Sequence, residues 1–143
     1  MKKSKINFVL FIGLAYFISN QTTQAYKLYC PSPEFIALND VNNHFEYSAP
    51  MKIQDDPSDR KIVMRGLGKE KFDVASFSLQ AASINSNNQL SCLYGNSQTS
   101  GTPQTITLLA KLPKESTCTV TYPKGHEYPE LVYFKCSDSR TKE

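Results

Sequence analysis

The stretch from Cys118 to Cys136, CTVTYPKGHEYPELVYFKC, has the alternation of a β-hairpin closed by a disulfide. If the two cysteines oppose each other on antiparallel strands, the apolar residues between them share the cysteine face, because strand side chains alternate with period two. The facing pairs are then Val120 with Phe134 and Tyr122 with Val132. Directly opposed residues also lie within the Cα separation that a disulfide requires. We therefore predict a hairpin stapled by Cys118–Cys136.

The two remaining cysteines, Cys30 and Cys92, form the second disulfide by elimination. Four cysteines allow three pairings, and the hairpin register selects this one. In the chain-entropy model, closing a loop of about 60 residues stabilises the folded state by roughly 4 kcal/mol.

The first 25 residues have the pattern of a secretory signal peptide. Three lysines precede a short apolar run from Phe8 to Ile18, which is about half the length that a membrane-spanning helix needs. Thr23 and Ala25 suit signal peptidase, so we expect cleavage before Tyr26. We expect no lipid on Cys30, because the bulky residue before it does not fit a lipidation signal. The mature protein is then exported, to the periplasm or the extracellular medium, where disulfides form.

The charge of the mature chain differs from that of the full sequence. Three of the sixteen Lys and Arg residues leave with the signal peptide, whereas all thirteen Asp and Glu residues stay, so the formal charge falls to near zero. This balance gives no support for a nucleic-acid partner or for a polybasic membrane-binding patch. Residues 26–143 have the size of one domain.

Short runs of alternating apolar residues, separated by Asn, Asp, Gly, Pro and Ser, predict an all-β fold. The expected strands are 34–38, 44–48, 60–65, 72–84, 90–94, 104–112, 117–122 and 131–136. Residues 73–84 also fit helical spacing, behind a possible cap at Asp73, but their alternation favours a strand.

We expect these strands to form a single antiparallel β-sandwich-like domain of seven or eight strands in two sheets, braced by the two disulfides. The expected core is Phe35, Phe45, Ile62, Met64, Phe77, Leu79, Leu90, Ile106, Leu108, Val120 and Phe134.

The sequence has no motif for catalysis, a metal or a cofactor. It lacks the paired Cys or His spacing of a zinc site, and it has no nucleophile elbow and no phosphate-binding glycine loop. DDPSD at 55–59 lacks the glycine and the distal glutamate of a calcium-binding EF-hand loop. We therefore expect no metal, no cofactor and no enzyme activity.

The loop PKGHEYP combines charge, a titratable ring and an aromatic side chain between two prolines. A restricted loop loses less entropy on binding, so we expect this loop to contact a protein or glycan partner. The candidate contact residues are Lys124, His126, Glu127 and Tyr128. The expected function is that of a secreted or periplasmic binding module. Two alternatives are an inhibitor of a secreted hydrolase and a small hydrolase with an unrecognised site.

Two short motifs, CP at Cys30 and Pro31 and LSCLY at 90–94, precede further candidate strands. In these features the chain resembles small exported proteobacterial proteins grouped as domain of unknown function 3757. The resemblance implies export and a β-rich fold, and it implies no activity and no functional residue.

Overall fold

A computed structural model describes residues 24–96, 103–123 and 132–139. These residues form two antiparallel sheets and two single-turn 3₁₀ helices, which confirms the all-β prediction. The strands are β1 (Ala25–Tyr29), β2 (Ala37–Val41), β3 (His44–Pro50), β4 (Lys52–Gln54), β5 (Val63–Gly68), β6 (Ser78–Ile84), β7 (Gln89–Gly95), β8 (Thr105–Lys111), β9 (Ser116–Thr121) and β10 (Tyr133–Asp138). The 3₁₀ helices are η1 (Pro33–Phe35) and η2 (Val74–Ser76).

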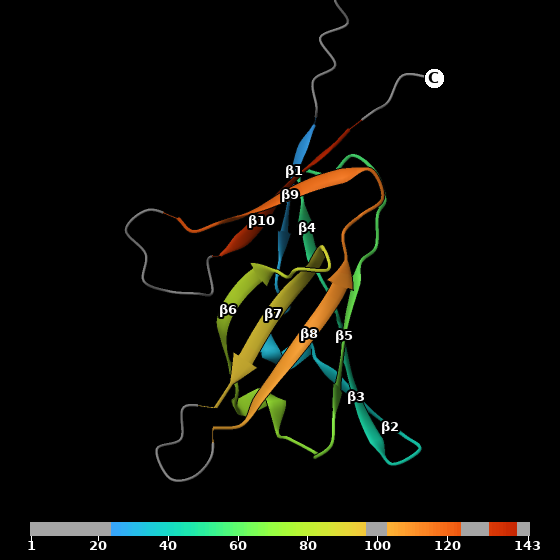
Figure 1. The fold of residues 1–143 in the computed structure, drawn as a ribbon, viewed down its shortest axis with the longest axis vertical. Helices are drawn as coiled ribbons and strands as arrows, with labels where there is room; N and C mark the ends of the chain where they lie inside the picture. Colours follow the sequence, from blue (N-terminus) through green and yellow to red (C-terminus); the bar gives the residue numbers. More distant parts are fainter. Residues whose placement is uncertain (1–23, 97–102, 124–131, 140–143) are drawn as a thin grey trace, which may run out of the picture.

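The two sheets occupy different halves of the molecule (Figure 1). The four-stranded sheet has the order β4-β1-β10-β9, and the six-stranded sheet has the order β2-β3-β5-β8-β7-β6. Buried side chains from both sheets form one continuous apolar core.

The stapled hairpin has the predicted register. Cys118 pairs with Cys136, and Val120 pairs with Phe134. Both disulfides, Cys118–Cys136 and Cys30–Cys92, are formed as predicted. The expectation for Tyr122 was wrong, because β9 ends at the preceding residue and the Tyr122 side chain is 60% exposed. Its hydroxyl donates to the backbone carbonyl of Ala82 in β6 (3.1 Å).

β1 is a strand that the sequence analysis did not predict. It lies between β10 and β4, with Leu28 opposite Phe134 on one side and Ile53 on the other. Tyr26 and Leu28 alternate with less buried neighbours and are themselves fully buried. The short β4 was also missed, so the described residues contain ten strands rather than seven or eight.

Several predicted strands begin later than expected, and two of them start with a 3₁₀ turn. In the first, Phe35 belongs to η1 and is 64% exposed, so its assignment to the core was wrong. A 3₁₀ turn that starts at a proline turns this side chain out of the alternation that a strand would impose. In the segment 73–84, η2 comes first and β6 follows, so most of the segment is the preferred strand.

The other residues expected in the core are fully or partly buried. Seven residues are buried as expected: Met64, Phe77, Leu79, Leu90, Ile106, Leu108 and Phe134. Phe45, Ile62 and Val120 are partly buried against the core.

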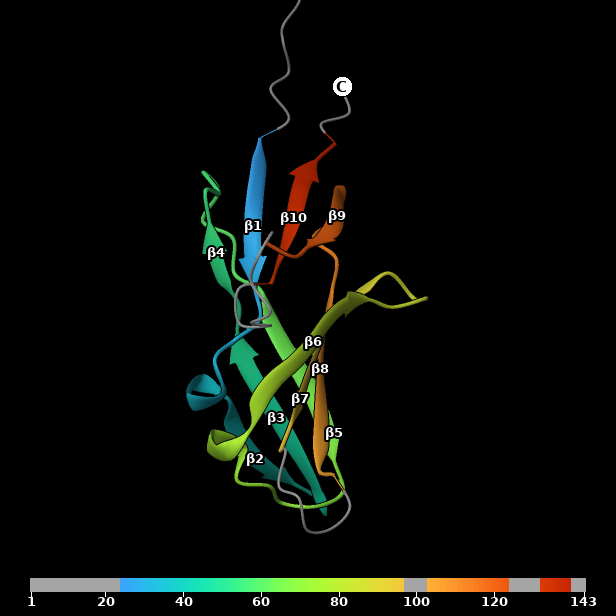
Figure 2. The ribbon, with the colours of Figure 1, turned by 90° about the vertical axis from the view of Figure 1, so that its left-hand side faces the viewer.

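The chain crosses between the sheets four times, from β1 to β2, from β3 to β4, from β4 to β5 and from β8 to β9, and two of these crossings bear on the candidate site. β3 and β4 are separated only by Met51, whose backbone N–H donates to the carbonyl of Ile62 (2.9 Å), yet they belong to different sheets (Figure 2). The last crossing joins β8 to β9 through a turn in which the Ser116 N–H donates to the Pro113 carbonyl (3.0 Å). Residues near both crossings line the candidate site described below.

A first prediction compares the two disulfides by alanine replacement of both cysteines of each pair. The cysteines of Cys30–Cys92 are 62 residues apart and those of Cys118–Cys136 are 18 apart. The chain-entropy model gives losses of about 4 and about 3 kcal/mol for the two pairs. Urea unfolding of the two double variants should therefore show the larger loss for Cys30 and Cys92. The reverse order would mean that strain or residual structure outweighs loop length.

A second prediction concerns Tyr94, whose buried hydroxyl donates to the Pro31 carbonyl (2.5 Å). Tyr94→Phe leaves this carbonyl without that donor and should lower the free energy of unfolding by about 1–3 kcal/mol. The matched control is Tyr133→Phe, because the Tyr133 hydroxyl has no hydrogen bond among the described residues. Equal losses in the two variants would contradict the prediction.

The same variant has a predicted pH dependence. Burial raises the pKa of Tyr94 above the ordinary value of 10.0. As the pH rises past that value, the unfolded chain loses the Tyr94 proton while the folded chain keeps it, so this contribution to stability is complete below pH 10.0 and is lost above it. The stability gap between wild type and Tyr94→Phe should narrow above that pH, by up to about 1.4 kcal/mol per unit. A gap that stays constant in urea titrations across this range would contradict the assignment.

Candidate functional site

The four residues expected to bind a partner, Lys124, His126, Glu127 and Tyr128, lie outside the described residues. The proposed contact loop therefore stays a prediction. The described residues contain two other arrangements of charged side chains. One is a polar cluster around Arg60, and the other is a groove that begins beside it.

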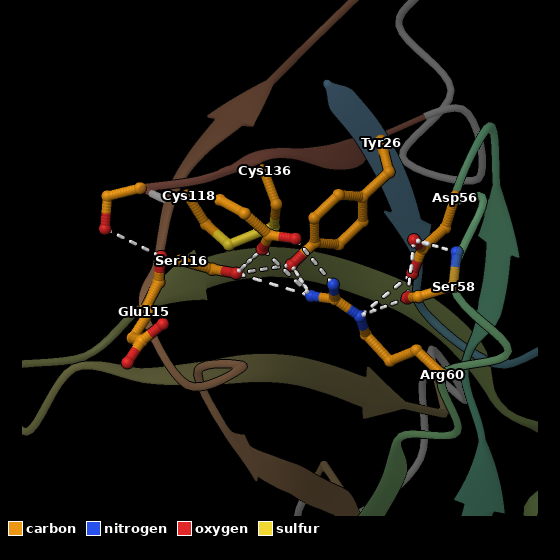
Figure 3. Close-up of polar contacts among 10 residues, drawn as sticks. Tyr26, Asp56, Ser58, Arg60, Glu115, Ser116, Cys118 and Cys136 are labelled. Carbon is orange, nitrogen blue, oxygen red and sulfur yellow. Dashed lines mark hydrogen bonds and ion pairs between the residues drawn. A yellow bond between two sulfur atoms is a disulfide. The ribbon is translucent and has the colours of Figure 1, made fainter. Parts of the chain in front are cut away.

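Arg60 lies in the segment that leads from β4 to β5, and its guanidinium binds two carboxylates (Figure 3). Nε contacts Asp56 Oδ2 at 2.9 Å within the same segment. On the other side, Nη2 contacts Asp138 Oδ2 at 2.8 Å, and Nη1 donates to Asp138 Oδ1 at 3.2 Å. This bidentate pairing ties the segment to the end of β10.

The aromatic ring of Tyr26 lies against the same guanidinium, with the carbon Cζ of Arg60 4.3 Å from the ring centroid. Arg60 Nη1 also donates to the hydroxyl of Tyr26, which shares a 2.7 Å hydrogen bond with Ser116 Oγ. Ser116 Oγ in turn donates to Asp138. The Arg60 side chain thus contacts β1, β9 and β10, which are three strands of the four-stranded sheet.

The protonation states of Arg60 and Tyr26 do not change near neutral pH. The hydrogen bond to Asp138 raises the pKa of Arg60, and burial raises the pKa of Tyr26. Near neutral pH the guanidinium therefore stays protonated and the phenol stays neutral, so neither is suited to transfer a proton. The Arg60 cluster is a structural cross-link that positions residues 60–63.

A groove of about 680 Å³ runs from this cluster over the six-stranded sheet. Its walls come from the start of β5, from the end of β8 and from the turn after β8. The lining residues are Arg60, Lys61, Ile62, Val63, Arg65, Gln89, Leu109, Ala110, Lys111, Pro113 and Lys114. β5 and β8 are paired at Arg65 and Leu109. This pairing brings the cations of residues 60–65 close to those of residues 111–114.

A second hollow of about 590 Å³ continues the groove along β5 and β8. The two share Arg65, Gln89 and Leu109, so they form one surface, which we call the β5–β8 groove. The second hollow adds Glu46, Gly66, Leu67 and Thr107. A Cβ atom on Gly66 would lie 2.4 Å from the Thr107 carbonyl oxygen, so the close approach of the strands requires glycine here.

The first part of the β5–β8 groove is lined by five basic residues and no acidic one. Arg60 is neutralised by its two carboxylates, and Arg65 pairs with Glu46 at 3.2 Å. Lys61, Lys111 and Lys114 are exposed, and the described residues include no ion pair to any of them. Three unneutralised ammonium groups on one hollow surface attract an anion.

Sequence reasoning missed this site because it relied on the total charge. Over residues 26–143, thirteen Asp and Glu residues balance thirteen Lys and Arg residues, but the balance does not hold locally. The signal was present in two short stretches, RKIVMR at 60–65 and KLPK at 111–114. Only the pairing of β5 with β8 shows that both stretches belong to one surface.

In the part of the chain that the structure describes, no three His, Cys, Asp or Glu residues are grouped so that they could hold a metal ion. The same residues include no helix long and apolar enough to cross a membrane. The side chains that line the β5–β8 groove are amines, guanidiniums, one amide, one hydroxyl, one carboxylate and aliphatic groups. These lining residues include no histidine and no pair of carboxylates.

A third prediction tests the structural role of the cluster by Arg60→Met. The change leaves Asp56, whose side chain is 4% exposed, without its ion-pair partner. We expect a loss of about 2–4 kcal/mol in the free energy of unfolding, measured by urea denaturation. The control is Arg65→Met, because that side chain is 68% exposed and its ion pair should contribute less than about 1 kcal/mol. Similar losses in the two variants would show that Arg60 is not a cross-link.

No protein-family model matches the chain, and no curated protein or solved structure matches it at a significant level.

Proposed function

We propose that the protein is an exported binding module that recognises an anionic partner in the β5–β8 groove. One observation carries the proposal: Lys61, Lys111 and Lys114 converge on a hollow whose first part has no acidic lining residue. Because the mature chain has a net charge near zero, this local excess of cations makes the groove a favourable region for an anionic ligand.

The scaffold supports a binding role. The cations stand on or beside strands β5 and β8, and the Arg60 cluster holds the segment that precedes β5. A surface fixed by sheet pairing loses little conformational entropy on binding. The groove therefore needs no large rearrangement to accept a ligand.

The disulfides support the expected location. Two disulfides brace the domain, and the described residues contain no free cysteine. Disulfides persist in oxidising compartments. Together with the signal-peptide pattern, they favour export to the periplasm or the extracellular medium.

A fourth prediction tests the binding role with the triple variant Lys61→Gln/Lys111→Gln/Lys114→Gln. The immobilised mature domain is exposed to envelope and culture-medium extracts, each captured protein or glycan is identified, and its affinity is then measured with purified material. We expect the triple variant to bind the identified partner about ten-fold more weakly, because it loses three exposed attractive contacts. Added salt should weaken the wild-type complex.

The matched control is Lys69→Gln/Lys71→Gln/Lys135→Gln, which removes the same charge from exposed lysines that do not line the groove. This control should bind like the wild type. Equal binding by the groove variant would assign recognition to another surface. If the domain captures nothing and a hydrolase screen shows turnover, the enzyme alternative replaces the binding module.

A further inference from the structure

We infer that the β5–β8 groove binds an acidic protein segment in which aliphatic side chains accompany the carboxylates. This inference rests on the proposed function and specifies the partner. Three features of the groove carry it: its exposed aliphatic side chains, its lack of aromatic side chains, and the arrangement of its cations.

The outward face of β5 exposes aliphatic side chains beside a cation. Val63 is 46% exposed and Leu67 is 78% exposed, and Arg65 lies between them on the same face. On β8, Leu109 is half-buried next to the exposed Lys111. Ile62 and Pro113 add apolar surface at the end nearest the Arg60 cluster. A ligand that carries only charge would leave this apolar surface in water, whereas aliphatic side chains would cover it.

The lining of the groove contains no Phe, Tyr or Trp. Proteins that bind single-stranded nucleic acids stack the bases on aromatic side chains. The C–H faces of sugar rings are attracted to the negative faces of aromatic rings in a similar way. A groove without aromatic side chains therefore favours a protein segment over a nucleic acid or a glycan.

The cations and aliphatic groups alternate along the strands. Residues i and i+2 of a strand share a face and lie roughly 7 Å apart. On β5 this places Val63, Arg65 and Leu67 in a row, and on β8 it places Leu109 next to Lys111. An extended segment laid along the strands has the same spacing on its own face. A carboxylate can then lie near Lys111, which has no ion pair among the described residues, while a neighbouring aliphatic side chain contacts the apolar surface.

A fifth prediction uses a labelled peptide of about 12 residues, rich in Glu and Leu, which in extended form spans roughly 40 Å. Fluorescence anisotropy with the mature wild-type domain should show saturable binding. The variant Lys61→Gln/Lys111→Gln/Lys114→Gln should bind about ten-fold more weakly, and Lys69→Gln/Lys71→Gln/Lys135→Gln should bind like the wild type. Leu67→Ser, a change at a side chain that is 78% exposed, should weaken binding without loss of stability.

Reference ligands separate the outcomes. They are the same peptide with every Leu replaced by Ser, polygalacturonate and oligothymidine. Preference for the Glu and Leu peptide over all three supports the inference. Equal binding of the Ser peptide, or tighter binding of polygalacturonate or oligothymidine, overturns it and leaves the binding module with a different anionic partner. If no probe binds and the extracts also yield no partner, the proposed function fails as well.

Discussion

The contact between Arg60 and the four-stranded sheet is a polar cross-link between the two halves of the molecule, which also share one apolar core. The guanidinium pairs with Asp138 on β10 and lies against Tyr26 on β1, although Arg60 itself belongs to the segment that enters the six-stranded sheet. A lysine could supply the charge but not the planar, bidentate geometry. The next residues, 61–63, begin the groove, so a structural cross-link and a binding surface occupy consecutive positions of the chain.

Sequence reasoning succeeded where the information was local. The register of β9 and β10 follows from the alternation between Cys118 and Cys136, and a shift by one residue would have placed Phe134 on the opposite face. It failed where partners are distant in sequence. β1 is flanked by β4 and β10, and four of its five residues are apolar or aromatic, so the alternation in its burial is not evident from the sequence. Phe35 was misplaced because a turn that begins at Pro33 replaced the expected strand.

Charge at the candidate site was also mispredicted because its residues are distant in sequence. Net charge is a sum over the sequence, whereas a ligand responds to the field of nearby groups within about a Debye length. Asp56 and Asp138 neutralise Arg60 inside the cluster and leave the lysines of the groove without a described carboxylate partner. Only the pairing of β5 with β8 determines which cations are neighbours. Composition could exclude a uniformly basic protein, but it could not exclude a basic surface.

The position of β1 beside β10 also has a consequence for the order of folding. The first and last strands of the described chain are neighbours in the sheet, with Ala25 opposite Ser137 (Figure 1). Pairing over such a separation is slow, because the loop entropy is lost before the contacts form. During synthesis from the N-terminus, β1 has no partner on that side until β10 has appeared. The six-stranded sheet, with the groove on it, can assemble first, and the four-stranded sheet closes last.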